Sequence, residues 1–166
     1  HRRGAVHLAP VLIPSRPMTT ETVAGASPQT ARLIRFFETM TMDELPRLGE
    51  IYADDCRFKD PFHEVHGVEA VRRIYAHMYR ALHEPRFRVV RSFEQGRECM
   101  LVWEFLFAFR RTPRQPQVVK GCSHLVLAGD GRIQAHRDYW DAAEELYEKL
   151  PGLGALMRWI KRRARA

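Results

Sequence analysis

A change of pattern at Pro85 constrains the fold more than any other feature of this 166-residue sequence. Before it, apolar residues recur at the spacing of amphipathic helices, and after it come runs rich in Val, Phe and Leu that are typical of strands. The turn Gly129-Asp130-Gly131 joins the last two runs as a hairpin. The C-terminal half therefore predicts four antiparallel strands, over 87–93, 99–110, 117–128 and 132–140.

Three helices and one strand are predicted before Pro85. Ser27-Pro28 is a helix start, with serine as the N-cap and proline at the first helical position. The second helix would present Leu48, Ile51 and Tyr52 on one face. The predicted elements are a helix over 27–40, a short helix from about 45 to 55, a strand over 56–62 and a helix over 68–82.

This order of elements predicts an α+β domain with a cavity. Helices packed on one face of a curved, mostly antiparallel sheet give a cone-shaped interior, the architecture of a cystatin-like α+β barrel, here with an extra C-terminal helix. We expect 1–26 to be a disordered leader, of which 1–17 are an upstream segment. We expect 27–148 to form the domain and 149–166 to form a basic amphipathic helix.

The net charge of +7 lies at the two ends of the chain. Residues 1–17 carry +3 and residues 158–166 carry +5, which leaves a near-neutral body. Because a nucleic-acid-binding domain carries its positive charge on the folded body, no nucleic-acid partner is expected. The apolar and basic segment 153–166 suits peripheral contact with an anionic membrane, or alternatively packing on the sheet or on a partner subunit.

The three cysteines indicate the compartment. An odd number without a C-x-x-C pair excludes a disulfide framework and a cysteine zinc site. A reducing, cytoplasmic setting follows, with attachment at the inner membrane surface if the C-terminal helix binds lipid. No run of 18 apolar residues is present, so no membrane-spanning helix is predicted.

Two stretches resemble a known superfamily. YADDCRFKDPFHEVHG (52–67) and GDGRIQAHRDYWD (129–141) are similar to the nuclear-transport-factor-2-like superfamily, and within it to the SnoaL-like branch. That branch includes polyketide cyclases, ketosteroid isomerases and limonene-epoxide hydrolases. The resemblance covers about 28–148, and it implies the cone fold more specifically than any one reaction, because this fold hosts many functions.

For the ketosteroid isomerases, the resemblance implies that Asp60 is the proton-shuttling base. Their two oxyanion donors, a tyrosine and a protonated aspartic acid, fall at Phe36 and Ser123 of this sequence. Losing both donors costs several kcal/mol of transition-state stabilisation. Steroid isomerisation by that mechanism is therefore not expected.

For the epoxide hydrolases, the resemblance implies that Asp138 is the water-activating base. Phe105 and Phe107 stand where that family has an arginine and a second aspartate. Phe58 and Asp60 stand where it has a water-positioning tyrosine and asparagine. With half of that site missing, the resemblance points instead to SnoaL-type cyclases, which need an aspartate base and an apolar pocket.

Asp60 and Asp138 are the candidate catalytic residues. Asp60 precedes Pro61 at a strand end and shares a face with Phe58, where partial desolvation would suit a general base. The alternative is that Asp60 accepts turn hydrogen bonds, as Asp-Pro often does. Asp138 on the last strand would assist, or would form a structural ion pair with an arginine.

Aromatic and small polar side chains are the candidate pocket lining. Trp103, Phe105 and Phe107 share one face of the long strand, and Ser123 is preferred to His124 because neighbours on a strand face opposite sides. The alternative for each aromatic residue is core packing. The candidate substrate-binding residues are Phe36, Phe58, Tyr75, Trp103, Phe105, Phe107, Ser123, His136 and Trp140.

These features predict a small-molecule enzyme, an isomerase, cyclase or hydrolase, that acts on a hydrophobic ligand without a cofactor. No metal site is expected, because His63-x-x-His66, beside Asp60 and Glu64, lies in a loop and lacks the H-E-x-x-H spacing. The alternative function is a non-catalytic ligand-binding or scaffolding module. The resemblance further implies a homodimer formed through the sheet.

Overall fold

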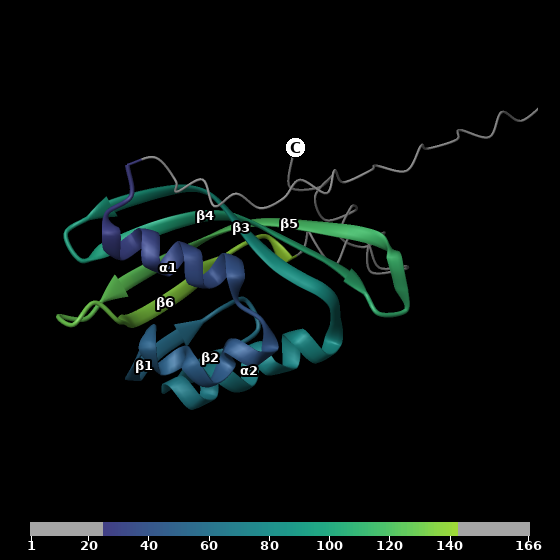
Figure 1. The fold of residues 1–166 in the computed structure, drawn as a ribbon, viewed down its shortest axis with the longest axis horizontal. Coiled ribbons are helices and arrows are strands. Elements are labelled where there is room, and N and C mark those ends of the chain that lie inside the picture. Colours follow the sequence, from purple (N-terminus) through teal and green to yellow (C-terminus); the bar gives the residue numbers. More distant parts are fainter. Residues whose placement is uncertain (1–24, 143–166) are drawn as a thin grey trace, which may run out of the picture.

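The computed structural model describes residues 25–142 (Figure 1). The expected leader up to residue 24, the end of the domain and the expected C-terminal helix lie outside the described residues. The helical segments are α1 (Pro28–Thr39), the 3-10 helix η1 (Met42–Glu50) and α2 (Val68–Ala81). The strands are β1 (Tyr52–Lys59), β2 (Glu64–His66), β3 (Leu82–Gln95), β4 (Glu98–Phe109), β5 (Thr112–Leu127) and β6 (Ile133–Tyr139).

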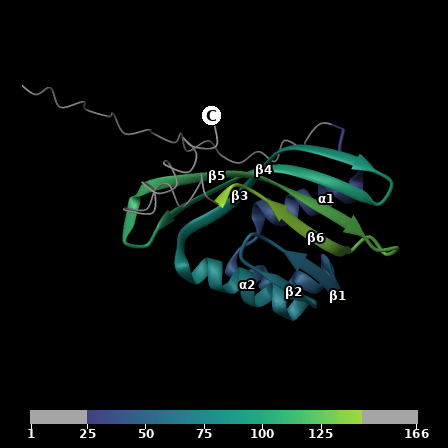
Figure 2. The same ribbon diagram turned by 180° about the vertical axis from the view of Figure 1, so that it is seen from behind.

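The six strands form one curved, unclosed sheet in the order β2-β1-β6-β5-β4-β3. Every neighbouring pair is antiparallel except β1 and β6, which run parallel. Figure 1 shows α1 lying across the concave side of the long strands, with α2 below it next to β1 and β2. Figure 2, from behind, shows the long strands bending around these helices. The predicted α+β fold with a wrapped sheet is confirmed.

Local sequence explains where α1 begins and which side it buries. The Ser27 hydroxyl oxygen accepts a hydrogen bond from the Thr30 amide at 3.2 Å, and Pro28 occupies the first turn. Leu33 and Phe37 are buried on the side of α1 that faces the sheet. The predicted start and apolar face of this helix are confirmed.

The prediction for 45–62 is partly wrong. The predicted second helix is the 3-10 helix η1, which begins at Met42 and ends at Glu50. Tyr52, predicted to lie on that helix, is the first residue of β1, where it pairs with Ile133 of β6. The spacing of Leu48, Ile51 and Tyr52 imitates a helical face, but Tyr52 is buried through a strand instead.

The four C-terminal strands follow the prediction, with β3 and β5 longer, β4 shifted by one residue and β6 shorter by one residue at each end. β3 begins directly after α2 and includes Pro85, a residue that lacks a backbone donor. Proline is tolerated there because β3 is an edge of the sheet. In the β5–β6 hairpin, Gly131 takes a positive φ of 84°, which glycine adopts without steric cost. Among residues 25–142, no helix is both long enough and apolar enough to cross a membrane.

The burial of Cys99 on β4 makes the protein less stable at alkaline pH. Burial raises the pKa of the Cys99 thiol to about 11, whereas an unfolded thiol ionises near about 8.5. Between these two pKa values the unfolded state binds fewer protons than the folded state. The free energy of unfolding therefore falls as pH rises. In urea titrations at about pH 7.5 and 10, the wild type should lose more stability than Cys99→Ala. Equal losses would show that this thiol ionises at the same pH in the folded and unfolded states.

Candidate active site

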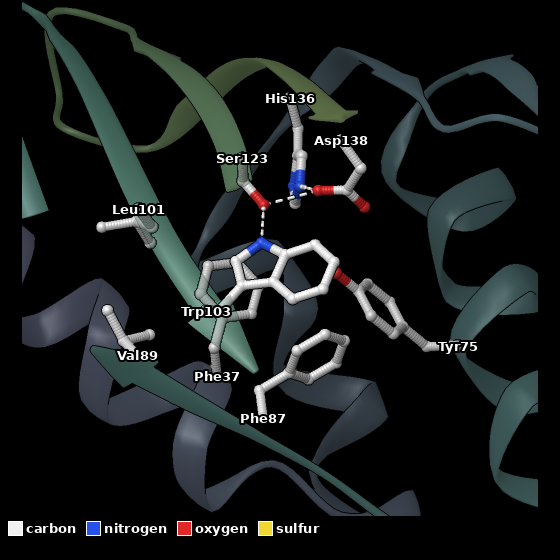
Figure 3. Close-up of a pocket in the computed structure, with 9 residues that line it drawn as sticks. All are labelled: Phe37, Tyr75, Phe87, Val89, Leu101, Trp103, Ser123, His136 and Asp138. Carbon is white, nitrogen blue, oxygen red and sulfur yellow. Dashed lines mark hydrogen bonds and ion pairs between the residues drawn. The ribbon is translucent and has the colours of Figure 1, made fainter. Parts of the chain in front are cut away.

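A small aromatic cavity lies between the helices and the concave face of the sheet. Its volume is about 20 Å³, enough for about one water molecule. Figure 3 shows the polar groups gathered at one end, with the aromatic rings and aliphatic side chains below them. The lining residues are Phe37, Tyr75, Phe87, Val89, Leu101, Trp103, Ser123, His136 and Asp138.

The polar end of this cavity is built from adjacent strands. The register pairs Ser123 of β5 with Asp138 of β6, and strand alternation puts both on the face that carries His136. The Ser123 hydroxyl donates to Asp138 Oδ1 at 2.5 Å, and His136 Nε2 lies 2.7 Å from the same oxygen. Trp103 Nε1 donates to Ser123 Oγ at 2.8 Å, which commits the serine proton to the carboxylate. Asp138 is thus held by two donors.

The Trp103 ring reaches Ser123 because the residue opposite it on β5 is Gly121. A Cβ atom on Gly121 would lie 2.5 Å from Trp103 Cη2 and 2.9 Å from the backbone oxygen of Tyr139. Real contacts of this kind do not occur, so the position requires glycine. The close approach sets the height of the indole above the sheet.

Two buried tyrosines continue the polar network away from Asp138. The Tyr52 hydroxyl lies 2.7 Å from His136 Nδ1 and 3.2 Å from the Tyr75 hydroxyl. The Tyr52 and His136 rings are nearly parallel, with centroids 5.9 Å apart. Burial raises the pKa of both tyrosines well above the ordinary value, so both hydroxyls are neutral and able to donate. Six side chains, from Trp103 to Tyr75, form one connected network.

Asp138 is also exposed on a second side. It borders an open groove of about 600 Å³, and its side chain is 17% exposed. Both hydrogen bonds to Asp138 go to Oδ1, and no group of residues 25–142 donates to Oδ2. The remaining residues of the groove are Lys59, Asp60, Pro61, Arg137, Tyr139, Trp140 and Asp141.

A model of the SnoaL-like domain matches residues 33–136. The chain belongs to the SnoaL-like family. None of the curated proteins with which it was compared matches this SnoaL-like domain. The resemblance seen in the sequence is therefore confirmed at the level of the family.

Solved structures share the fold of this SnoaL-like domain. A Catenulispora acidiphila protein with a ketosteroid isomerase-like fold, in complex with trimethylamine, is 15% identical with a TM-score of 0.62, covering 73% of this chain and 92% of its own. An NTF2-like protein of unknown function from Burkholderia pseudomallei is 18% identical, with a TM-score of 0.62. The match covers 72% of this chain and 95% of that protein. An LEH-like epoxide hydrolase from M. tuberculosis is 16% identical with a TM-score of 0.58, covering 78% and 92%. At these identities the likeness shows the fold alone.

Asp60 lies in the turn after β1 of this SnoaL-like domain and borders the groove, not the cavity. Its Oδ1 accepts from the backbone amides of Phe62 and His63 at 2.7 and 2.6 Å. His63 Nδ1 lies 2.9 Å from the other oxygen, Oδ2. Its side chain is 14% exposed. Asp60 is therefore the acceptor of turn hydrogen bonds, the alternative that the sequence left open. Asp60 and Asp138 both border the groove.

The structure gathers five of the predicted site residues around the cavity and leaves six outside its lining. Alternation on β5 places Ser123 in the cavity and His124 on the opposite face, beside Glu98. Those that line the cavity are Tyr75, Trp103, Ser123, His136 and Asp138. Those that do not are Phe36, Phe58, Asp60, Phe105, Phe107 and Trp140.

The outlying aromatic residues support the cavity from behind or beside it. The Phe58 ring packs edge-on against the His136 ring, with the ring centroids 4.8 Å apart. Phe105 stacks on Phe87 at 4.6 Å and contacts Phe107 at 5.0 Å, so these rings extend the aromatic wall beyond the lining. Trp140 borders the groove. On α1, Phe37 rather than Phe36 reaches the cavity, because the helix turns that position toward the sheet.

Sequence reasoning missed Tyr52, the residue that joins His136 to Tyr75. It missed Phe87 and Leu101 as lining residues, although both lie on strands that the sequence predicted. Strand parity offered a usable signal for Leu101, which shares the face of Trp103. No comparable signal exists for Tyr52, because the local spacing of apolar residues there favours a helix.

The predicted loop position of His63-x-x-His66 is partly wrong, because His66 is the last residue of β2, where it pairs with Arg57. His63 bonds Asp60, while Glu64 pairs with Lys59 at 2.5 Å. Between residues 25 and 142, no cluster of three or more His, Cys, Asp or Glu side chains has the arrangement to hold a metal ion.

Proposed function

We propose that this SnoaL-like domain is a small-molecule enzyme that uses Asp138 as a general acid and base on a hydrophobic ligand. The single observation that supports it most is the position of the Asp138 carboxylate. Oδ1 is held by Ser123 and His136, Oδ2 receives no hydrogen bond from residues 25–142, and Asp138 borders a groove that a ligand can enter. A positioned carboxylate of this kind contributes about 10²- to 10⁴-fold to a proton transfer.

The chemistry follows from a group that takes and returns one proton. In an isomerisation or cyclisation, Oδ2 would accept a proton from the ligand and return it at another atom. In a hydrolysis, it would accept a proton from water as the water oxygen attacks, and would return it to the leaving oxygen. Neither sequence transfers electrons to an acceptor, so we propose no redox cofactor.

The ligand class follows from the surfaces on the two sides of Asp138. Trp140 and Pro61 border the groove, and the cavity behind is lined mostly by aromatic and aliphatic side chains. Burial of apolar ligand surface there is worth about 25 cal/mol per Å². With three free cysteines, Cys56, Cys99 and Cys122, we propose that the enzyme works in the reducing cytoplasm.

A test that can be run before the substrate is identified compares masses. An apolar small-molecule extract is incubated with the wild type or with Asp138→Asn and analysed by mass spectrometry. We expect the wild type to convert one compound to an isomer of equal mass, or to a product heavier by one water, and the variant to leave it unchanged. Conversion by both proteins would overturn the role of Asp138.

A second candidate is a non-catalytic ligand-binding or scaffolding module, and the small cavity favours scaffolding. A volume of about 20 Å³ holds no substrate unless side chains move. In the same experiment, a compound that the wild type retains through purification and returns unaltered would support binding and contradict catalysis.

A further inference from the structure

A continuous hydrogen-bond chain joins Asp138 to Tyr75 beside the cavity. His136 Nε2 lies 2.7 Å from Asp138 Oδ1, and His136 Nδ1 lies 2.7 Å from the Tyr52 hydroxyl. The Tyr52 hydroxyl lies 3.2 Å from that of Tyr75. Tyr52 and His136 are buried, and Tyr75 closes the chain at the cavity wall. The four side chains come from β6, β1 and α2.

With Asp138 as a carboxylate, the direction of each hydrogen bond in the chain follows from the chemistry of its donors and acceptors. A carboxylate only accepts, so His136 Nε2 carries a hydrogen and donates it to Asp138. In a neutral imidazole, Nδ1 then accepts from the Tyr52 hydroxyl. The Tyr52 oxygen in turn accepts from Tyr75. All donors therefore point toward Asp138, and the Tyr75 oxygen is left with a lone pair for the cavity.

We propose that His136 and Tyr52 form a proton wire that makes the Tyr75 hydroxyl a second proton-exchange position for the ligand. The wire rests on the proposed function, in which Asp138 is the final proton acceptor. It goes beyond that function because it assigns a role to Tyr75, on α2, and to two residues that join it to β6. The proposed ligand therefore carries an acidic O–H or C–H group.

Every proton and electron pair in the proposed step is accounted for. The bond between the ligand and its acidic hydrogen breaks, its electron pair stays on the ligand, and the hydrogen bonds to the Tyr75 oxygen. The original Tyr75 proton moves to Tyr52, the Tyr52 proton to His136 Nδ1, and the Nε2 proton to Asp138. Asp138 ends neutral and the ligand ends as an anion.

The same step reverses the direction of all four hydrogen bonds between the ligand and Asp138. Afterwards His136 Nδ1–H donates to Tyr52, Tyr52 donates to Tyr75, and the new Tyr75 O–H points to the ligand anion. A hydroxyl placed at a developing negative charge stabilises it. The wire would thus remove a proton and supply an oxyanion donor with one side chain, Tyr75.

Protons from solution provide a test without a ligand. A proton taken up at His136 Nδ1 would make that nitrogen a donor and would reverse both tyrosine hydroxyls. The other titratable groups that act on the tyrosines are Cys56 of β1, Asp60 of the following turn and Tyr79 of α2. Tyr79 donates to the Met40 backbone oxygen at 2.6 Å, away from the wire, so it offers a matched control.

The experiment is an NMR titration of the full chain carrying [15N]histidine and [13Cζ]tyrosine, over roughly pH 4 to 9, which brackets ordinary aspartate and histidine titration. In the wild type we expect the Tyr75 Cζ resonance to follow the His136 nitrogens with the same midpoint. In Tyr52→Phe, the Tyr75 resonance should no longer follow them. In Tyr79→Phe, the Tyr75 response should be unchanged.

Each outcome decides the wire independently of catalysis. If the Tyr75 Cζ resonance of the wild type does not change as His136 titrates, the wire is overturned. This measurement suffices even if Tyr52→Phe fails to fold. If the Tyr75 resonance followed the His136 nitrogens equally in the wild type and in Tyr52→Phe, the wire would also be overturned, because the Tyr52 hydroxyl would then not relay the proton. Absence of turnover on any compound would overturn the proposed function while leaving this titration intact.

Discussion

Asp138→Asn is expected to lower turnover by about 10²- to 10⁴-fold on any compound that the wild type converts. The asparagine amide cannot take the proton, although its oxygen can still accept from Ser123 and His136. The fold should therefore persist, with a loss of about 1 kcal/mol from the weakened hydrogen bonds. Steady-state kinetics and urea unfolding measure the two effects separately.

Asp60→Asn is the matched control for that variant. Asp60 borders the same groove, but its Oδ1 is occupied by two backbone amides of the turn after β1. We expect Asp60→Asn to keep most of the turnover, since an asparagine oxygen can accept the same bonds. A larger loss of turnover for Asp60→Asn than for Asp138→Asn would reverse the assignment of the base.

Gly121→Ala is expected to destabilise the protein by about 1–3 kcal/mol, the range for overpacking a core. The new methyl group would lie 2.5 and 2.8 Å from Trp103 Cη2 and Cζ2. Because the Tyr139 backbone oxygen lies 2.9 Å away on another side, the indole must move and its bond to Ser123 must break. Denaturation monitored by tryptophan fluorescence and circular dichroism reports both the loss and the displaced ring.

Gly129→Ala provides the comparison for this substitution. A Cβ at Gly129, in the turn after β5, would meet nothing within 4 Å. A surface change of this kind alters the free energy of unfolding by about 0.5 kcal/mol or less. Equal stability of the Gly121 and Gly129 variants would contradict the close packing of Trp103 on the sheet.

The sheet and the polar end of the cavity were predictable because strand alternation is a local rule. The hairpin around Gly131 and the parity of β5 and β6 place Ser123, His136 and Asp138 on one face. α1 behaves differently, since Phe36 and Phe37 are both apolar and adjacent. Which of the two reaches the cavity depends on how the helix is rotated against the sheet, and that rotation is set by packing between distant segments.

Tyr52 and Asp60 show two further limits. Tyr52 joins β1 because β6, which follows some 80 residues later, supplies its partner Ile133, and a window of local sequence contains no trace of that pairing. For Asp60, local sequence supported a base and a turn acceptor equally. The hydrogen bonds from Phe62 and His63 depend on the path of the turn, which only the folded backbone fixes.

The placement of Asp138 between a small cavity and an open groove has a consequence for substrate range. On the cavity side, side chains already fill nearly all the space, so whatever part of a molecule reaches past the carboxylate has to be compact. On the groove side no such restriction applies. An enzyme built in this way would be strict about the reacting end of a compound and indifferent to the bulk attached behind it.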